Sequence, residues 1–282
     1  MKMGMNRAVI GKEYPIVEFD VNPKDFTFYA LATNEYDNPY YWEENRPGGI
    51  MAPPMFAVVY GGMCIPGVIS DKDLGMNLMM MVHGEQDIRW FKPAKWGMKL
   101  KSRAKMVDIV DKGSGELCQF SISTWDQAND KVAEALVGFF VRGGGSGKKE
   151  EKKPEPQPGK SIFEVKTKVL PQQTYIYAFA SGDHNFIHVN PEMAKKVGLP
   201  GIILQGLCTM ALCQNAVVNT LCEKNPERLK RLAVRFARPV LPNDELTIYG
   251  WETKAGSPRE VAFEAKKQEG TAVVKNGIAE IA

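Results

Sequence analysis

The chain is poor in the residues on which several large classes of protein depend. Its 282 residues include five cysteines, at positions 64, 118, 208, 213 and 222, and none of them forms a CxxC pair. An odd and scattered set of this kind argues against a disulfide framework or a zinc site, and for a reducing compartment. Histidine is rarer still, with three in the whole chain. Histidine chemistry, if there is any, must therefore be concentrated in very few places.

Long apolar runs and strong net charge are also missing. The most apolar run, Ile202 to Val218, is interrupted by three amide side chains, whereas a membrane span needs roughly 20 residues with few such interruptions. The first residues, MKMGMNRAVIGKEY, contain no apolar signal-peptide core. The net charge of +3 is too mild for nucleic-acid binding but suits a polyanionic small molecule. We therefore expect neither a membrane nor a nucleic acid as a partner.

What the chain does contain is a low-complexity stretch over residues 143–160, which reads GGGSGKKEEKKPEPQPGK. Gly, Ser, Pro, Lys and Glu bury too little apolar surface to offset the cost of ordering. The stretch is therefore predicted to be a linker that is flexible and then partly extended. It separates an N-terminal domain, residues 1–142, from a C-terminal domain, residues 161–282.

The two domains repeat the same patterns in the same order. YALATNEYDNPY from Tyr29 aligns with YAFASGDHNFIH from Tyr177, and GGIMAPPMFAVV from Gly48 resembles PGIILQGLCTMA from Pro200. WFKPAKWGMKL, from residue 90, likewise resembles FARPVLPNDEL, from residue 236. Three matches in one order and at similar offsets indicate an internal duplication of one domain.

Each copy is expected to combine a helix with an antiparallel sheet. In the C-terminal copy a buried helix is predicted over residues 202–221, followed by strands in RLAVRFARPVL, LTIYGWETK, REVAFEAKK and TAVVKNGIAEIA. Branched and aromatic residues alternate along these strands, and PND, AGSP and EGT mark the turns between them. A largely apolar helix with such a sheet wrapped round it is an α+β architecture.

The segment SGDHNFIH, residues 181–188, holds two of the three histidines. At the mouth of an apolar pocket, Asp183 and His188 could share one water molecule, each accepting a hydrogen bond from it. Asn185 would hold the loop or the carboxylate between them. Gly206, near the start of the predicted helix, would offer its N–H to developing negative charge, and the helix dipole would add to that attraction.

A structural explanation of this segment competes with the catalytic one. Asp, Asn and Gly are turn formers, and an isolated Asp–His pair is more often structural than catalytic. The duplication favours catalysis, because the aligned positions of the first copy hold Glu35, Tyr40 and Pro54, and proline has no N–H to donate. An active copy paired with an inactive one explains why all three groups differ together, and a structural turn does not.

The sequence resembles the hydratase 2 (MaoC-like) branch of the hotdog-fold superfamily. The pattern of that branch, S-G-D-x-N-P-L-H followed by H-G-L-C-T, is matched here by YAFASGDHNFIHVNPEMAK and GIILQGLCTMA. VHGEQDIRWFKP and VDIVDKGSGE extend the resemblance into the first half, and it is strongest to the (R)-specific 2-enoyl-CoA hydratase unit of the type 2 peroxisomal multifunctional enzymes. Phe186 and Gln205 depart from the pattern, since they stand where the family usually has proline and histidine.

The resemblance implies a double hotdog, two tandem repeats that each wrap an antiparallel sheet round a long helix. It implies a carbon–oxygen lyase that reversibly hydrates trans-2-enoyl-CoA to (3R)-3-hydroxyacyl-CoA. Asp183 and His188 would activate the water and the Gly206 N–H would bind the thioester oxygen, with no metal and no cofactor beyond the CoA of the substrate. A homodimer is expected, and an ending of AEIA in place of a S-K-L-type signal favours a cytoplasmic location.

The resemblance also implies a set of substrate-binding positions. His83, Gly84, Lys112 and Phe236 fall on positions that contact CoA or the acyl group, and Asn185 is counted with them. From the residues alone, an apolar histidine or a strand phenylalanine is more simply a core residue, and a turn lysine is more simply solvated. The altered loop of the first copy leads to the hypothesis that the interior of this domain is open to hold a long or bulky acyl chain.

Three other functions fit parts of the pattern. A hotdog thioesterase usually places its carboxylate differently, and a non-catalytic acyl-CoA-binding protein would have no need of both Asp183 and His188. A (3R)-hydroxyacyl-carrier-protein dehydratase is harder to separate, because the reacting acyl group is the same. Loss of the enoyl-thioester absorbance of crotonyl-CoA, compared between the wild type and Asp183→Asn, would test the hydratase, and release of free thiol would indicate the thioesterase.

Overall fold

The structure is a computed structural model that describes residues 4–148 and 158–282. The elements of the first half are η1 (Arg7–Val9), β1 (Val17–Asp20), α1 (Pro23–Ala32), α2 (Pro39–Trp42), η2 (Pro54–Phe56), α3 (Ala57–Tyr60), η3 (Gly62–Cys64), α4 (Ile65–Ile69), η4 (Leu78–Met80), β2 (Met81–Trp90), β3 (Lys99–Asp111), β4 (Gly115–Trp125) and β5 (Lys131–Arg142). The elements of the second half are β6 (Phe163–Lys168), α5 (Gln173–Ser181), α6 (Phe186–Val189), α7 (Pro191–Lys196), α8 (Gly206–Leu221), η5 (Pro226–Arg228), β7 (Leu229–Phe236), β8 (Glu245–Lys254), β9 (Arg259–Lys267) and β10 (Ala272–Ile281).

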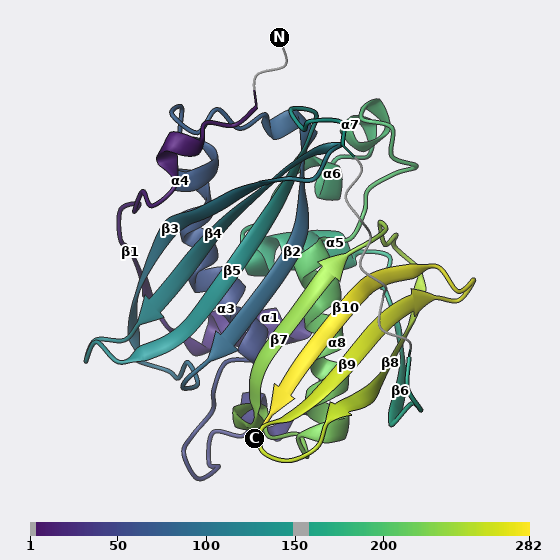
Figure 1. The fold of residues 1–282 in the computed structure, drawn as a ribbon. Helices are drawn as coiled ribbons and strands as arrows, with labels where there is room; N and C mark the ends of the chain where they lie inside the picture. Colours follow the sequence, from purple (N-terminus) through teal and green to yellow (C-terminus); the bar gives the residue numbers. More distant parts are fainter. Residues whose placement is uncertain (1–3, 149–157) are drawn as a thin grey trace.

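The ten strands found in the described residues form one sheet, in the order β1-β3-β4-β5-β2-β7-β10-β9-β8-β6. Each half supplies five neighbouring strands, and the halves meet where β2 pairs with β7. Counted outward from this seam, equivalent strands of the two halves follow one another in the same order. Two copies related by an approximate twofold axis would be arranged in this way. In Figure 1 the teal strands of the first half continue into the green and yellow strands of the second, with the helices behind the sheet.

The register at the seam matches the duplication. Asp87 of β2 lies opposite Ala233 of β7. These two residues are 146 positions apart, the same offset that aligns Trp90 with Phe236, so they are equivalent positions in the two copies. The approximate axis passes through this pair of residues. The two ends of the seam are consequently equivalent places in the two copies, one near His83 and the other near Trp90.

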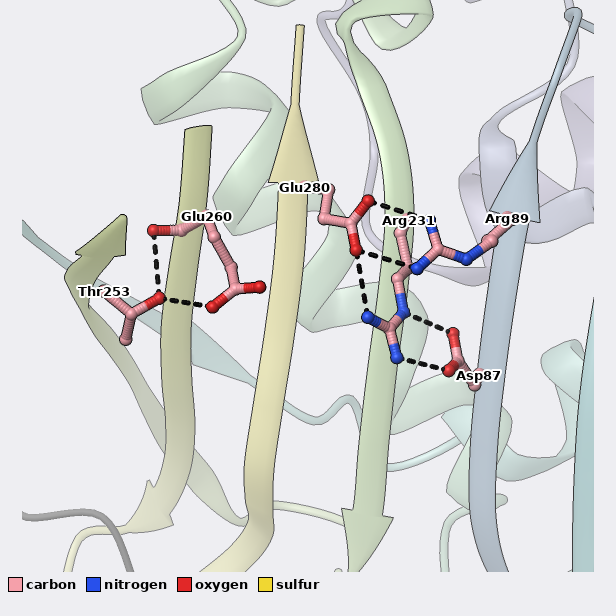
Figure 2. Close-up of polar contacts among 6 residues, drawn as sticks. All are labelled: Asp87, Arg89, Arg231, Thr253, Glu260 and Glu280. Carbon is pink, nitrogen blue, oxygen red and sulfur yellow. Dashed lines mark hydrogen bonds and ion pairs between the residues drawn. The ribbon is translucent and has the colours of Figure 1, made fainter. Parts of the chain in front are cut away.

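Ion pairs tie the strands together across the seam. Arg231 of β7 donates to both carboxylate oxygens of Asp87, at 2.9 and 2.6 Å, and to Glu280 of β10 at 2.9 Å. Arg89 of β2 donates to both oxygens of Glu280, at 2.8 and 2.9 Å, so that three strands share one network (Figure 2). Asp87 and Arg89 alternate along β2 with the buried residue Ile88, which places the network on the face of the sheet turned away from the core.

The helices of the two copies also meet near the axis. Tyr29 of α1 and Tyr177 of α5, which the sequence alignment makes equivalent, are both fully buried. Their ring centroids lie 5.6 Å apart and their hydroxyl oxygens 3.4 Å apart. The predicted α+β architecture, a helix against an antiparallel sheet in each copy, is confirmed by this arrangement.

The long helix survives in only one copy. In the second half α8 is continuous for 16 residues and almost wholly buried. The helix predicted from Ile202 begins at Gly206, because the preceding residues are extended and Leu204 donates to the carbonyl of Val240 at 2.8 Å. In the first half the aligned span breaks into η2, α3, η3 and α4, where two adjacent glycines and Pro66, which lacks an N–H, weaken the helical hydrogen bonding.

The predicted linker of residues 143–160 lies partly outside the described residues, since 149–157 are among those not described. Its first residues are held by hydrogen bonds: Gly143 donates to Ser114 at 3.0 Å, and the N–H of Ser146 lies 3.1 and 3.2 Å from the two Asp111 carboxylate oxygens. The domain limits of 1–142 and 161–282 stay predictions. Within the described part of the chain, no helix is both long and apolar enough to cross a membrane.

Candidate active site

The loop that carries Asp183 is fixed at both ends by local hydrogen bonds. Helix α5 ends at Ser181, and Gly182 follows in the left-handed conformation, with φ of 79°, which glycine adopts without steric cost. The N–H of Asp183 donates to the Ser181 hydroxyl at 3.2 Å. Asn185 then caps α6, accepting from the N–H of Ile187 at 3.3 Å. Asp183 is therefore held between two helix ends.

His188 lies in the last turn of α6 with a defined tautomer. Its Nδ1 lies 2.7 Å from the backbone carbonyl of Ile203. Because a carbonyl only accepts, Nδ1 carries the proton and donates, and Nε2 of the neutral ring is left as an acceptor. Burial lowers the pKa of His188, while Asp183 and the Ile203 carbonyl act in the opposite direction. A neutral ring with a free Nε2 lone pair is the form that accepts a proton from water.

Asp183 and His188 face each other across a gap that one water molecule can bridge. Nε2 of His188 lies 3.8 Å from Oδ2 of Asp183, with the histidine side chain 10% exposed and the aspartate side chain 40% exposed. The separation is too long for a good direct hydrogen bond and leaves both atoms as acceptors. A water molecule between them would donate one hydrogen to each and present its oxygen to a ligand. The predicted pair is thus brought together.

Gly206 is the first residue of α8, where the N–H groups have no partner inside the helix. Among the described residues, none accepts a hydrogen bond from this N–H. The ring of Phe236, at the end of β7, lies so close that a Cβ added to Gly206 would meet three ring atoms at 3.3 Å. A larger residue would therefore need the ring to shift by a few tenths of an ångström, and the N–H and the positive end of the helix dipole stay open to an anion.

The first half contributes His83, which enters the site from β2. Its ring stands edge-on to Phe236 at 5.3 Å and to Phe139 at 5.0 Å. Burial lowers the pKa of His83 from 6.5 to about 4, and the nearby Asp183 carboxylate acts in the opposite direction. His83 is therefore neutral at ordinary pH and lies within electrostatic reach of Asp183. His83 of the first copy and the loop that carries Asp183 in the second copy thus share one site.

Two glutamines support this arrangement. Gln86, two residues before Ile88 on the inward face of β2, accepts a hydrogen bond from Nε2 of His83 at 3.1 Å. Gln205, fully buried, donates to the Thr174 carbonyl at 3.0 Å and to the Asp183 carbonyl at 3.4 Å, which fixes the loop against α5. The sequence pattern points to Gln205, as a departure from the family, but not to Gln86. A polar residue at an inward strand position was the signal that could have found it.

The other predicted binding residues are at the same end of the sheet. Gly84 is the extra residue of a β-bulge between β2 and β5, since the register shifts between His83 and Glu85. Lys112 lies in the turn between β3 and β4, and its N–H donates to Gly115 at 2.9 Å. Asn185 acts as a helix cap, a role that holds the loop. Whether these residues contact a substrate stays a prediction.

The corresponding groups of the first copy are used differently. Glu35 is buried and accepts a hydrogen bond from the Asn219 side chain at 2.9 Å. Its pKa is raised by burial, which the bond from Asn219 opposes. The Tyr40 ring stacks under the guanidinium of Arg46. In the described residues we find no contact between Glu35 and Tyr40, so this copy lacks the paired acceptors of the second.

A small cavity of about 20 Å³ begins next to Gly206 and runs under the sheet of the first half. At the site end it is lined by Leu207, next to Gly206, and by Gln86, the partner of His83. Its walls come from the broken helix and from inward residues of β2, β4 and β5. The site therefore combines two acceptors for a water, one free N–H and a small, mainly apolar space.

Comparisons with known proteins agree with this layout. Residues 19–143 match the family model of the MFE-2 hydratase 2 N-terminal domain, and residues 152–276 match that of the MaoC like domain. A probable enoyl-CoA hydratase 2 of Dictyostelium discoideum is 27% identical over 97% of this chain and 95% of its own length.

Among solved structures, the MaoC-like dehydratase of Phytophthora capsici has a TM-score of 0.84 at 28% identity, covering 98% of each chain. A Mycobacterium tuberculosis protein with a double hotdog fold has a TM-score of 0.60 at 11% identity, covering 96% of each chain. That similarity bears on the fold alone. The chain has the double hotdog fold that its sequence predicts.

Proposed function

Since the two halves of this chain belong to the MFE-2 hydratase 2 N-terminal and MaoC-like domain families, we propose that it hydrates trans-2-enoyl-CoA reversibly to (3R)-3-hydroxyacyl-CoA. The chain is an enzyme of the hydratase class, a carbon–oxygen lyase. The stereochemistry, the residues and the steps that follow are our proposal. They rest on the arrangement of the loop, the helix terminus and the cavity.

The observation that carries the proposal is the tautomer of His188 opposite Asp183. With Nδ1 donating to Ile203, Nε2 and the Asp183 carboxylate are two acceptors 3.8 Å apart, and they orient one water. The water oxygen bonds to C3 of the enoyl group, and the proton that the water gives up goes to the Asp183–His188 pair. The pair delivers a proton to C2, which completes the addition and leaves both side chains in their starting state.

Gly206 supplies the electrostatic part of the mechanism. When hydroxyl adds to C3, negative charge moves to the thioester oxygen, which becomes enolate-like. The Gly206 N–H at the start of α8 would donate to that oxygen, supported by the helix dipole. Phe236 and His83 enclose the same space and exclude water from it, which strengthens the hydrogen bond.

The first half serves as the acyl-binding part of the enzyme. The cavity beside Leu207 starts where the thioester would lie and continues between the broken helix and the sheet. An unbroken helix like α8 would fill this space, so the loss of the helix in the first copy provides the room. His83, Gly84, Lys112 and Phe236 are our proposed contacts for the acyl-CoA. The metal-free reaction, the homodimer and the cytoplasmic location stay predictions.

The test is hydration of crotonyl-CoA by the purified protein, followed as loss of enoyl-thioester absorbance. Asp183→Asn keeps the size of the side chain but weakens its role as acceptor and proton carrier, and we expect kcat/KM to fall by about a hundredfold or more. His184→Gln is the matched control, because His184 lies in the same loop and is exposed. A wild type that is inactive with every enoyl-CoA would contradict the proposal, as would an Asp183→Asn variant with undiminished activity. Release of free thiol would indicate a thioesterase.

A further inference from the structure

A second cavity lies beyond the first, and residues of both halves line it. It has a volume of about 140 Å³ and is lined mainly by apolar and aromatic side chains, among them Pro54, Trp90 and Ala94 of the first half and Leu229 of the second. Ile88 lines the near cavity and Trp90, two residues further along the same face of β2, lines the far one. Strand residues two apart are separated by about 7 Å. The two cavities therefore follow one another along the inner face of the sheet.

Tyr60 stands between the two cavities. Among the described residues it alone lines both of them. It is the last residue of α3, is 2% exposed, and its ring packs against Phe56 and Phe19 with centroids 6.1 and 6.4 Å away. A buried ring with a cavity on either side is a barrier between them.

The far cavity occupies the place that the duplication assigns to a second catalytic site. Pro54 corresponds to Gly206 and Trp90 to Phe236, and the indole N–H of Trp90 donates to the Pro54 carbonyl at 2.9 Å. Lys230 and the half-exposed Phe91 lie at its edge. The far cavity, at the position of the lost active site, thus lies in line with the near cavity, which we assign to the acyl chain. Among the described residues, Tyr60 is the one that both linings share.

We propose that Tyr60 determines which acyl chains the enzyme accepts, by closing the near cavity at the far end. This inference rests on the proposed function and makes it more specific. Acyl groups that end before Tyr60 bind in the near cavity, whereas longer ones would need the far cavity and meet the phenol ring. Removing the ring joins the two cavities and gives the tail of a long acyl chain an apolar site.

The experiment compares kcat/KM for crotonyl-, decenoyl- and hexadecenoyl-CoA between the wild type and two variants of Tyr60. Tyr60→Ala removes the barrier, and we expect the ratio of hexadecenoyl-CoA to crotonyl-CoA to rise about tenfold or more. Tyr60→Phe is the matched control, because it keeps the ring and removes only the hydroxyl. Its ratio is expected to stay within about twofold of the wild type. Tyr60→Leu, with an intermediate volume, should give an intermediate ratio, and it replaces Tyr60→Ala if that variant does not fold.

A second variant tests whether the far cavity receives the tail. Ala94 lines that cavity, and Ala94→Leu narrows it without touching the near one. In the Tyr60→Ala background this change should bring the ratio back to within about threefold of the wild-type value. If the ratio stays high, the tail does not enter the far cavity and the proposal is overturned. A folded Tyr60→Ala variant with the wild-type ratio overturns it as well.

Failure of the proposed function would be recognised separately. An inactive wild type contradicts the hydratase assignment but leaves the cavities to be tested by binding. The dissociation constants of butyryl-, decanoyl- and hexadecanoyl-CoA would then be measured by calorimetry for the wild type, Tyr60→Ala and Tyr60→Phe. A selective gain of about tenfold for hexadecanoyl-CoA in Tyr60→Ala would support the role of Tyr60. Equal affinities across the three proteins would exclude it.

Discussion

The contribution of the Gly206 N–H to catalysis can be tested by replacing Gly206 with proline, which has no N–H. The first copy has Pro54 at the equivalent position and still begins a helical turn there. Proline is favoured at the first position of a helix. Gln205 precedes Gly206 with φ of −57° and ψ of 135°, which is the conformation that a residue before proline adopts. Gly206→Pro should therefore remove the N–H and leave α8 in place.

The prediction is a comparison of Gly206→Pro with Gly206→Ala. Both add a Cβ against the Phe236 ring, but only alanine keeps the N–H. If the amide binds the thioester oxygen, kcat for crotonyl-CoA should be about a hundredfold to a thousandfold lower in the proline variant than in the alanine variant. Circular dichroism of both proteins checks that α8 has formed. Equal activities in two folded variants would remove Gly206 from the mechanism.

The burial of His83 has a consequence for stability at low pH. Its pKa in the folded protein is about 4, compared with 6.5 for an ordinary histidine. As the pH falls from 6.5 toward 4, the unfolded chain binds a proton that the folded protein does not, so the free energy of unfolding decreases. The loss is about 2–3 kcal/mol between near-neutral pH and pH 4.5. It is absent above the ordinary pKa, where both states are neutral at this site.

The measurement is urea unfolding near pH 7 and near pH 4.5 for the wild type and His83→Gln. Glutamine cannot titrate, so the variant should lose less stability on acidification than the wild type, by about 2–3 kcal/mol. His188, whose pKa is also lowered by burial, contributes equally in both proteins. The exposed His184 provides the control variant, His184→Gln, for replacing a histidine at the surface of the protein. An equally steep loss in His83→Gln would show that other groups carry the effect.

At the level of the elements, the two copies differ most in their central helix, and only one of them could be predicted well. The run from Gly206 to Leu221 is apolar and free of proline, and it forms α8. Its exact start depends on Leu204 bonding to the distant Val240, which no local pattern encodes. In the first copy Gly61, Gly62 and Pro66 indicate a weak helix. The alignment with the second copy nevertheless led to the prediction of a continuous helix there.

The loop that carries Asp183 and His188 was predictable because its geometry is local. Asp183 and His188 are five residues apart, and the turn and cap residues that set their separation lie between and beside them. His83 is different, because its proximity to Asp183 depends on the pairing of β2 with β7 across the whole chain. Only the family resemblance pointed to it. The same holds for Tyr60, which is an ordinary apolar helix residue until the cavities on both sides are seen.

At the level of the whole molecule, the halves are joined by much more than the segment between them. Strands β2 and β7 make one continuous sheet, and buried side chains bond across the interface. Gln214 accepts from the N–H of Met55 at 2.7 Å, and Asn215 donates to the carbonyl of Thr33 at 2.7 Å. Separation would expose the apolar core that both share and leave those polar groups unpaired.

We therefore predict that the covalent connection is dispensable for activity once the protein has folded. A recognition site for a specific protease, inserted between Lys153 and Pro154, would allow the chain to be cut after purification. The connection only raises the effective concentration of one half near the other, so at micromolar protein the cut halves should co-elute in gel filtration. They should keep crotonyl-CoA activity within about twofold of the uncut protein, because His83 and Asp183 stay in one site. Uncut protein treated with inactivated protease is the control. If the halves separate, the seam is weaker than its hydrogen bonds indicate; if they co-elute without activity, the connection itself positions the site.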